Sequence, residues 1–169
     1  ADSLLFAARD RFGVKPFYYS FDSTNFIFAS EINSLWIGGI TKIPNDKVWL
    51  NYFAEGSYGM PDETFWMGIQ QLSAGYFLTL KNNSLQIREW YHFEERIAKL
   101  TNHFEGNEEE YITRLLVKAI NLRFRADVPI GFNLSGGLDS STLLALIDQQ
   151  NTDKSTIETF TFITNDERY

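Results

Sequence analysis

The chain has 169 residues, of which 44% are hydrophobic and 22% are charged, a composition that is ordinary for a globular protein. Its net charge of −7 argues against a dominant nucleic-acid surface, and no apolar run approaches the roughly 20 residues that span a bilayer. The sequence contains no cysteine, which excludes a disulfide framework, a thiolate metal site and a cysteine nucleophile within these residues. We therefore expect a cytoplasmic protein without nucleic-acid or membrane partners.

Short aromatic-rich strands separated by turn residues dominate the first 92 residues. We expect strands at residues 4–8, 17–21, 26–29, 70–80 and 85–91, and short helices at residues 31–37 and 45–55. Asn45 or Asp46 is the expected cap of the second helix. Hairpins are expected across residues 22–25 and 81–84, so this part is predicted to be α+β with mostly antiparallel sheet.

Residues 93–106 are charged and lack strong periodicity, which favours a connection between two domains. A helix from Glu108 to about Phe124 is expected next, because Asn107 and Glu110 resemble a capping box and apolar residues follow at helical spacing. A strand at 128–134, a helix at 139–150 and a strand at 157–163 then form a βαβ unit. This order predicts an α/β second part with a parallel sheet.

After the predicted strand at 128–134, and extending into the predicted helix at 139–150, lies the run Ser135-Gly136-Gly137-Leu138-Asp139-Ser140-Ser141-Thr142. Glycines let the backbone approach an oxyanion closely, and free N–H groups at the positive end of a helix attract the anion. The serine and threonine side chains add hydroxyl donors. Asp139 would repel a phosphate unless a cation lay between them, so its presence suggests Mg²⁺.

A plain strand-to-helix turn with Ser135 or Ser140 as the helix cap is the simpler alternative. We favour the anion site because hydroxyls and an aspartate surround the glycine pair. Other motifs fit less well. No Gly-x-x-x-x-Gly-Lys-Ser/Thr or Gly-x-Gly-x-x-Gly occurs, and Asn133 stands where a nucleophile elbow has glycine.

The run from Ser135 to Ser141 resembles the pyrophosphate loop of ATP pyrophosphatases, enzymes that cleave ATP between the α and β phosphates. Together with the preceding Arg125-Ala126-Asp127-Val128-Pro129-Ile130-Gly131, it resembles asparagine synthase (glutamine-hydrolysing) and its relatives. Residues 9–19, 28–32 and 64–76 resemble segments of the glutaminase domain of that family, with Ser73-Ala74 where a proline pair is usual.

This resemblance implies a fold in two parts. Residues 1–92 would be the carboxyl-terminal part of a class II glutamine amidotransferase domain, an antiparallel-sheet remnant of an Ntn-type αββα fold. Residues 93–107 would be a linker. Residues 108–169 would be the amino-terminal part of an asparagine synthetase domain, with the parallel-sheet ATP-pyrophosphatase fold (adenine nucleotide α-hydrolase-like).

The resemblance also implies a ligase reaction. An aspartate side-chain carboxylate attacks the α-phosphorus of ATP, pyrophosphate leaves, and ammonia from glutamine displaces AMP to give asparagine and glutamate. Leu134 and Phe162, at the ends of adjacent strands, would contact the adenosine. The full set of residues implied to bind ATP is Leu134, Ser135, Gly136, Gly137, Leu138, Asp139, Ser140, Ser141 and Phe162, with Asp139 also placing Mg²⁺. A homodimer of the parent protein is compatible with the resemblance.

The glutaminase nucleophile of the family is an amino-terminal cysteine, which this sequence lacks, and further synthetase motifs of the family are not among these residues. We therefore expect a piece of a longer protein that has no complete activity by itself. Two alternatives stay open. One is a relative that adenylates another carboxylate, such as a β-lactam synthetase or a peptide-cyclising enzyme, and the other is a non-catalytic nucleotide-binding module.

Overall fold

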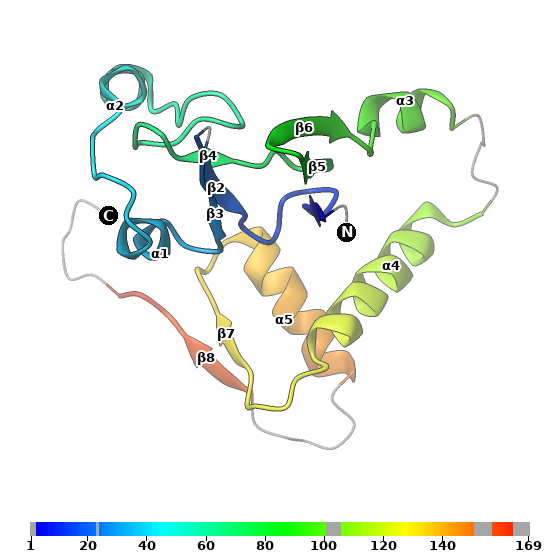
Figure 1. Ribbon diagram of the computed structural model, residues 1–169. Coiled ribbons are helices and arrows are strands. Elements are labelled where there is room, and N and C mark those ends of the chain that lie inside the picture. Colours follow the sequence, from blue (N-terminus) through cyan, green and yellow to red (C-terminus); the bar gives the residue numbers. More distant parts are fainter. Residues whose placement is uncertain (1–2, 23, 101–105, 151–156, 164–169) are drawn as a thin grey trace. The chain divides into compact units, whose positions relative to one another are not determined.

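The computed structural model describes residues 3–22, 24–100, 106–150 and 157–163 (Figure 1). The chain divides into two compact units, Ala1–Thr101 and Asn102–Tyr169, and each is described by itself. Within the described ranges, none of the helices combines the length and the apolar character needed to cross a membrane.

The first unit contains two antiparallel sheets. One of them has the strand order β1 (Leu4–Ala8), β5 (Tyr76–Lys81) and β6 (Ser84–Glu89). β5 and β6 form the predicted hairpin, whose two turn residues Asn82 and Asn83 have positive φ values of 49° and 60°. Asparagine tolerates this left-handed backbone better than most residues, which explains the tight turn.

The other sheet has the strand order β3 (Phe26–Ala29), β2 (Tyr18–Phe21) and β4 (Gln70–Gln71). The single strand predicted at residues 70–80 is therefore wrong, because β4 and β5 lie in different sheets. Gly75 allows the break with a φ of +73°, and its N–H donates to the Asp10 carbonyl at 2.9 Å. Leu72 and Leu78, on either side of this turn, pack with Tyr19 in a buried cluster.

The described part of the first unit also contains the helices α1 (Ile32–Ile37), α2 (Asp46–Glu55) and α3 (Phe93–Ala98). Asn45 occupies the cap position of α2, but its side chain does not make the predicted cap bond and donates instead to the Thr64 carbonyl at 3.2 Å. α3 lies where the sequence predicts an irregular connection, and none of its residues is buried. Residues 101–105 of the predicted linker lie outside the described residues.

In the second unit, β7 (Gly131–Asn133) pairs in parallel with β8 (Glu158–Phe160), and α5 (Leu138–Gln150) lies between them in the chain. This confirms the predicted βαβ order. Both strands are shorter than the predicted ranges of 128–134 and 157–163, because the ladder runs only from the pair Gly131 and Glu158 to the pair Asn133 and Phe160. Pro129 also lacks the N–H that an extended ladder would need.

α4 (Glu108–Arg123) matches its predicted range closely. The Asn107 side chain accepts hydrogen bonds from the N–H groups of Glu109 and Glu110 at 3.0 and 3.2 Å, which confirms the predicted cap residue. α4 packs against α5, and Ile120 and Ile147 are the buried residues of these two helices. This contact holds α5 and therefore the start of the helix after the glycine pair.

Candidate functional site

The glycine-rich loop, residues 134–137, lies between the carboxyl end of β7 and the start of α5. It leaves the sheet beside β8, because the Leu134 N–H donates to the Phe160 carbonyl at 2.9 Å. At the other side, the Ser141 N–H donates to the Gly137 carbonyl at 3.1 Å as the first turn of α5 closes. The loop thus joins the end of a parallel strand to a helix N-terminus, a place where open α/β sheets commonly bind ligands.

The two glycines of the loop differ in whether their backbone conformation requires glycine. Gly136 has a φ of +78°, a left-handed backbone that most side chains avoid, although a Cβ there would meet no heavy atom within 4 Å. At Gly137, a Cβ would contact only the hydroxyl oxygen of Ser135, at 3.4 Å. Conformation therefore requires glycine at position 136, and neither position is crowded by the rest of the second unit.

Two serine hydroxyls form a ring of hydrogen bonds around Gly137. The Gly137 N–H donates to Ser135 Oγ at 3.3 Å, and Ser140 Oγ donates to the Gly137 carbonyl at 3.2 Å. The two hydroxyl oxygens lie 3.1 Å apart. Either serine can be the donor in the bond between the two hydroxyls, since the Gly137 carbonyl also accepts from the Ser141 N–H. The ring fixes the peptide groups on both sides of Gly137.

The first turn of α5 supplies further donors. The N–H groups of Leu138, Asp139 and Ser140 stand at the start of the helix, where no carbonyl lies four residues earlier within it. The positive end of the helix dipole lies at the same place. Ser135, Asp139 and Ser141 are exposed, and Ser140 is partly buried. These N–H and hydroxyl groups are donors of the kind that an oxyanion needs, and the anion site itself stays a prediction.

Asp139 is the titratable residue of this region, and it lies in the first turn of α5. Across the described ranges, no three His, Cys, Asp or Glu side chains gather into a group that could hold a metal ion by themselves. Mg²⁺ often needs fewer protein ligands, because it keeps several waters and binds one or two carboxylates plus substrate phosphates. A single exposed carboxylate beside the glycine-rich loop fits a magnesium site of this kind.

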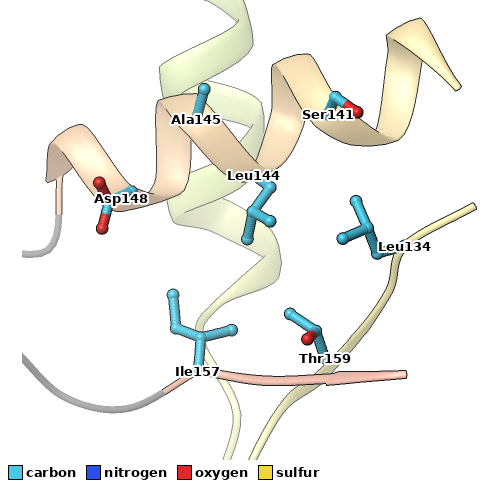
Figure 2. Close-up of a pocket in the computed structure, with 7 residues that line it drawn as sticks. All are labelled: Leu134, Ser141, Leu144, Ala145, Asp148, Ile157 and Thr159. Atoms are coloured by element: carbon cyan, nitrogen blue, oxygen red, sulfur yellow. The ribbon is translucent and has the colours of Figure 1, made fainter. Parts of the chain in front are cut away.

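A groove of about 530 Å³ runs from the glycine-rich loop along α5 and β8 (Figure 2). Leu134 and Ser141 lie near one end of the groove, and Asp148 and Ile157 lie near the other. The residues that line it are Leu134, Ser141, Leu144, Ala145, Asp148, Ile157 and Thr159. The four residues from α5 recur at helical spacing, so they share one face of the helix. The helical spacing of these four residues is the sequence pattern from which the groove could have been predicted.

The family resemblance implies that Phe162 and Leu134 contact the same nucleotide, but the two residues have different surroundings. Leu134 lines the groove, whereas Phe162 is not among the lining residues. Phe162 lies beyond the end of β8, and its side chain is 91% exposed. The structure therefore gathers residues 134–141 at one place, and a role for Phe162 stays a prediction.

Two family models match the chain, one after the other. Residues 1–91 match the family described as a glutamine amidotransferase domain. Residues 111–169 match the family described as asparagine synthase. The first match covers the antiparallel sheets of the first unit, and the second covers most of α4 together with the glycine-rich loop and α5.

Curated relatives match most of the chain. A putative glutamine-hydrolysing asparagine synthetase of Methanocaldococcus jannaschii is 39% identical over 161 residues, which are 93% of this chain and 30% of the relative. A glutamine-hydrolysing asparagine synthetase of Bacillus subtilis is 34% identical over 145 residues, which are 85% of this chain and 23% of the relative. The amidase chyE of Penicillium rubens is 30% identical over 147 residues, 85% of this chain and 21% of the relative.

The chain thus spans less than a third of the length of each of these relatives. Within that span, the glutamine amidotransferase match precedes the asparagine synthase match. This chain belongs to the asparagine synthase (glutamine-hydrolysing) family.

Proposed function

We propose that the chain is part of an ATP-dependent ligase that activates the side-chain carboxylate of aspartate and amidates it with ammonia from glutamine. The products would be asparagine, AMP, pyrophosphate and glutamate. The observation that carries this proposal is the geometry at the end of β7, where the left-handed Gly136 and the serine ring lead directly into the first turn of α5. The names of the relatives support the same reaction.

In the activation step, an aspartate oxygen attacks the α-phosphorus of ATP, and the bond to the bridging oxygen of pyrophosphate breaks. Negative charge then grows on pyrophosphate. The N–H groups of Leu138, Asp139 and Ser140 are placed to stabilise that charge in the transition state. Because Ser135 and Ser140 bond to each other and to Gly137, whereas Ser141 lines the groove beside the loop, Ser141 is the hydroxyl that we assign as a direct donor to the anion.

Asp139 would hold Mg²⁺ through its carboxylate, and the ion would supply positive charge to the phosphates. Gly136 and Gly137 would let the phosphates come close to the backbone. Leu134, at the loop end of the groove, would contact the adenosine together with Phe162. In the second step, ammonia attacks the acyl-adenylate and AMP leaves.

This function assigns a fold to each part of the chain. Residues 1–92 would belong to an Ntn-type αββα glutaminase domain that supplies ammonia, and residues 108–169 to an ATP-pyrophosphatase domain, with residues 93–107 linking them. Two antiparallel sheets in the first unit and a parallel strand pair in the second are compatible with this division. A cytoplasmic homodimer is the assembly that we propose for the whole protein.

A second candidate function is the same adenylation reaction with a carboxylic acid other than aspartate. The amidase chyE of Penicillium rubens and the amidase chry2 of Gibberella zeae are 30% and 29% identical to this chain, which is close to the identity of the synthetases. The same loop could therefore serve adenylation of a carboxylate other than that of aspartate.

Isotope exchange between pyrophosphate and ATP in the whole protein tests this function. We expect exchange that requires Mg²⁺ and aspartate, and that falls by at least about tenfold in Asp139→Asn, since one metal-binding carboxylate is lost. Exchange with another carboxylic acid but not with aspartate would favour the second candidate. Binding of ATP without exchange in the presence of any acid tested would contradict both and leave a non-catalytic nucleotide-binding module.

A further inference from the structure

The side chain of Phe160 covers one face of the backbone at Gly131. A Cβ added to Gly131 would lie 2.5 Å from Phe160 Cε2 and 3.3 Å from Cδ2, so the ring occupies the space that any side chain at position 131 would need. The two residues face each other diagonally across the β7–β8 ladder, since Gly131 pairs with Glu158 and Asn133 pairs with Phe160. Glycine at position 131 is therefore what allows the ring to lie against β7.

The backbone of the same residue holds the start of the glycine-rich loop. The Phe160 carbonyl accepts the hydrogen bond from the Leu134 N–H at 2.9 Å. The ring of Phe160 thus contacts Gly131, the first residue of β7. Its carbonyl binds Leu134, the residue that follows β7. Because β7 is only 3 residues long, these two contacts act on both of its ends.

We infer that Phe160 is a positioning residue for the pyrophosphate site. It sets where β7 ends and therefore where Ser135, Gly136 and Gly137 lie relative to the first turn of α5. The inference rests on the proposed function, because it assigns Phe160 a role toward the pyrophosphate that the loop would bind. Phe160 itself does not touch that anion. Its side chain is 58% exposed, so its removal leaves no buried cavity, and the main effect should fall on the loop.

The position of the loop can be tested without any ligand. Hydrogen exchange of the peptide that covers residues 131–137, measured by mass spectrometry in the whole protein, reports how firmly β7 and the loop are held. We expect Phe160→Ala to speed this exchange by about tenfold, and Phe160→Tyr, which keeps the ring, to change it by less than about twofold. Ile163→Ala is the matched control, because Ile163 is 80% exposed and lies beyond β8.

Calorimetric titration with magnesium pyrophosphate gives the functional readout. We expect about tenfold weaker binding in Phe160→Ala and in Gly131→Ala, because in the second variant the new Cβ displaces the ring. The double variant should bind no worse than either single variant, since both changes break the same contact. If Phe160 and Gly131 acted independently, the two losses would multiply, and the double variant would bind pyrophosphate about a hundredfold more weakly.

The outcomes separate this inference from the proposed function. If the unmodified protein does not bind pyrophosphate, the proposed function fails, and the exchange measurement alone decides whether Phe160 positions the loop. Unchanged exchange at residues 131–137 in Phe160→Ala would overturn the inference. So would faster exchange combined with unchanged pyrophosphate affinity, or a hundredfold loss in the double variant.

Discussion

Glycine is needed at position 136 because the backbone there is left-handed. Its φ is +78°, and a Cβ there would meet no heavy atom within 4 Å. We expect Gly136→Ala to destabilise the loop by about 1 kcal/mol, the cost of a left-handed backbone for an L residue. Gly137→Ala should change the stability by no more than a few tenths of a kcal/mol, because the added Cβ only makes an ordinary contact of 3.4 Å with Ser135 Oγ. Opening free energies from hydrogen exchange of residues 134–141 measure both, and equal costs would contradict this assignment.

Hydrogen bonds within a short turn lower the pKa of Asp22. Its carboxylate accepts hydrogen bonds from the Thr24 hydroxyl, the Thr24 N–H and the Asn25 N–H, each at 2.7 Å. These bonds, the one from the hydroxyl first, lower the pKa of Asp22 from 3.8 to about 2. Since the folded pKa lies below the unfolded value, the carboxylate stabilises the β2–β3 turn above pH 3.8, and this contribution is lost as the pH falls toward 2.

The titration of Asp22 can be followed through its carboxyl carbon in aspartate-labelled protein, with Asp22→Asn identifying the signal. At about pH 3, Asp22 should still be mostly ionised, whereas an exposed aspartate with the ordinary pKa should be mostly protonated. A midpoint near 3.8 for this carboxyl would show that the turn does not form these hydrogen bonds.

Among the elements of the first unit, the connection from β1 to β2 depends on one arginine. Arg9 is 8% exposed, and its guanidinium donates to the carbonyls of Gly13, Lys15 and Leu72 at 3.0, 2.8 and 2.6 Å. It thus ties the connection to the residue that follows β4. Removing the guanidinium leaves these acceptors without their donor.

We expect Arg9→Ala to destabilise the first unit by about 2 kcal/mol or more, because the bond to the Leu72 carbonyl is buried, and a buried acceptor left unpaired costs about 1–3 kcal/mol, while the bonds to Gly13 and Lys15 are partly buried. Arg9→Lys should recover little, because an ammonium on a flexible stem cannot reproduce the planar fork. Hydrogen exchange of the Leu72 N–H, which donates to the Phe17 carbonyl, measures the effect. Arg11→Ala is the control, since Arg11 is exposed and should cost less than about 1 kcal/mol. Equal losses in the two alanine variants would contradict the assignment.

The cap at the N-terminus of α4 can be tested separately, through its effect on the stability of this helix. Asn107 accepts from two N–H groups of the first turn, at 3.0 and 3.2 Å. Asn107→Ala should cost about 1 kcal/mol, and Asn107→Asp should retain most of that stability, because aspartate caps a helix as well as asparagine does. Exchange of the α4 amides measures the difference. No change in Asn107→Ala would mean that the cap does not limit the opening of this helix.

Particular residues explain which elements the sequence predicts. α4 is predicted well because a cap residue and apolar residues at helical spacing agree with each other. α3 is missed because it is only 6 residues long, so that Phe93 and Ile97 give a single apolar repeat at helical spacing within it. The break between β4 and β5 is missed because both sides of it read as extended sequence, and of residues 72–75 between them only Gly75 has a left-handed backbone.

For the whole molecule, the order of the two family segments is predictable from local motifs, because the motifs lie in sequence runs that need no long-range contact to be read. The candidate site is only partly predictable in the same way. Residues 134–141 come from one continuous run, whereas Ile157 and Thr159 reach the groove only through the parallel pairing of β7 and β8. The contact between Phe160 and Gly131 likewise depends on the register of that ladder.

In the proposed reaction, the glycine-rich loop and the first turn of α5 hold the pyrophosphate part of ATP. Glycine-labelled whole protein titrated with magnesium pyrophosphate tests this most directly, with the signals of Gly136 and Gly137 identified by their loss in the corresponding alanine variants. We predict that both amide signals shift and saturate together with the binding isotherm from calorimetry. Saturation of the protein by pyrophosphate with both signals unmoved would contradict the claim.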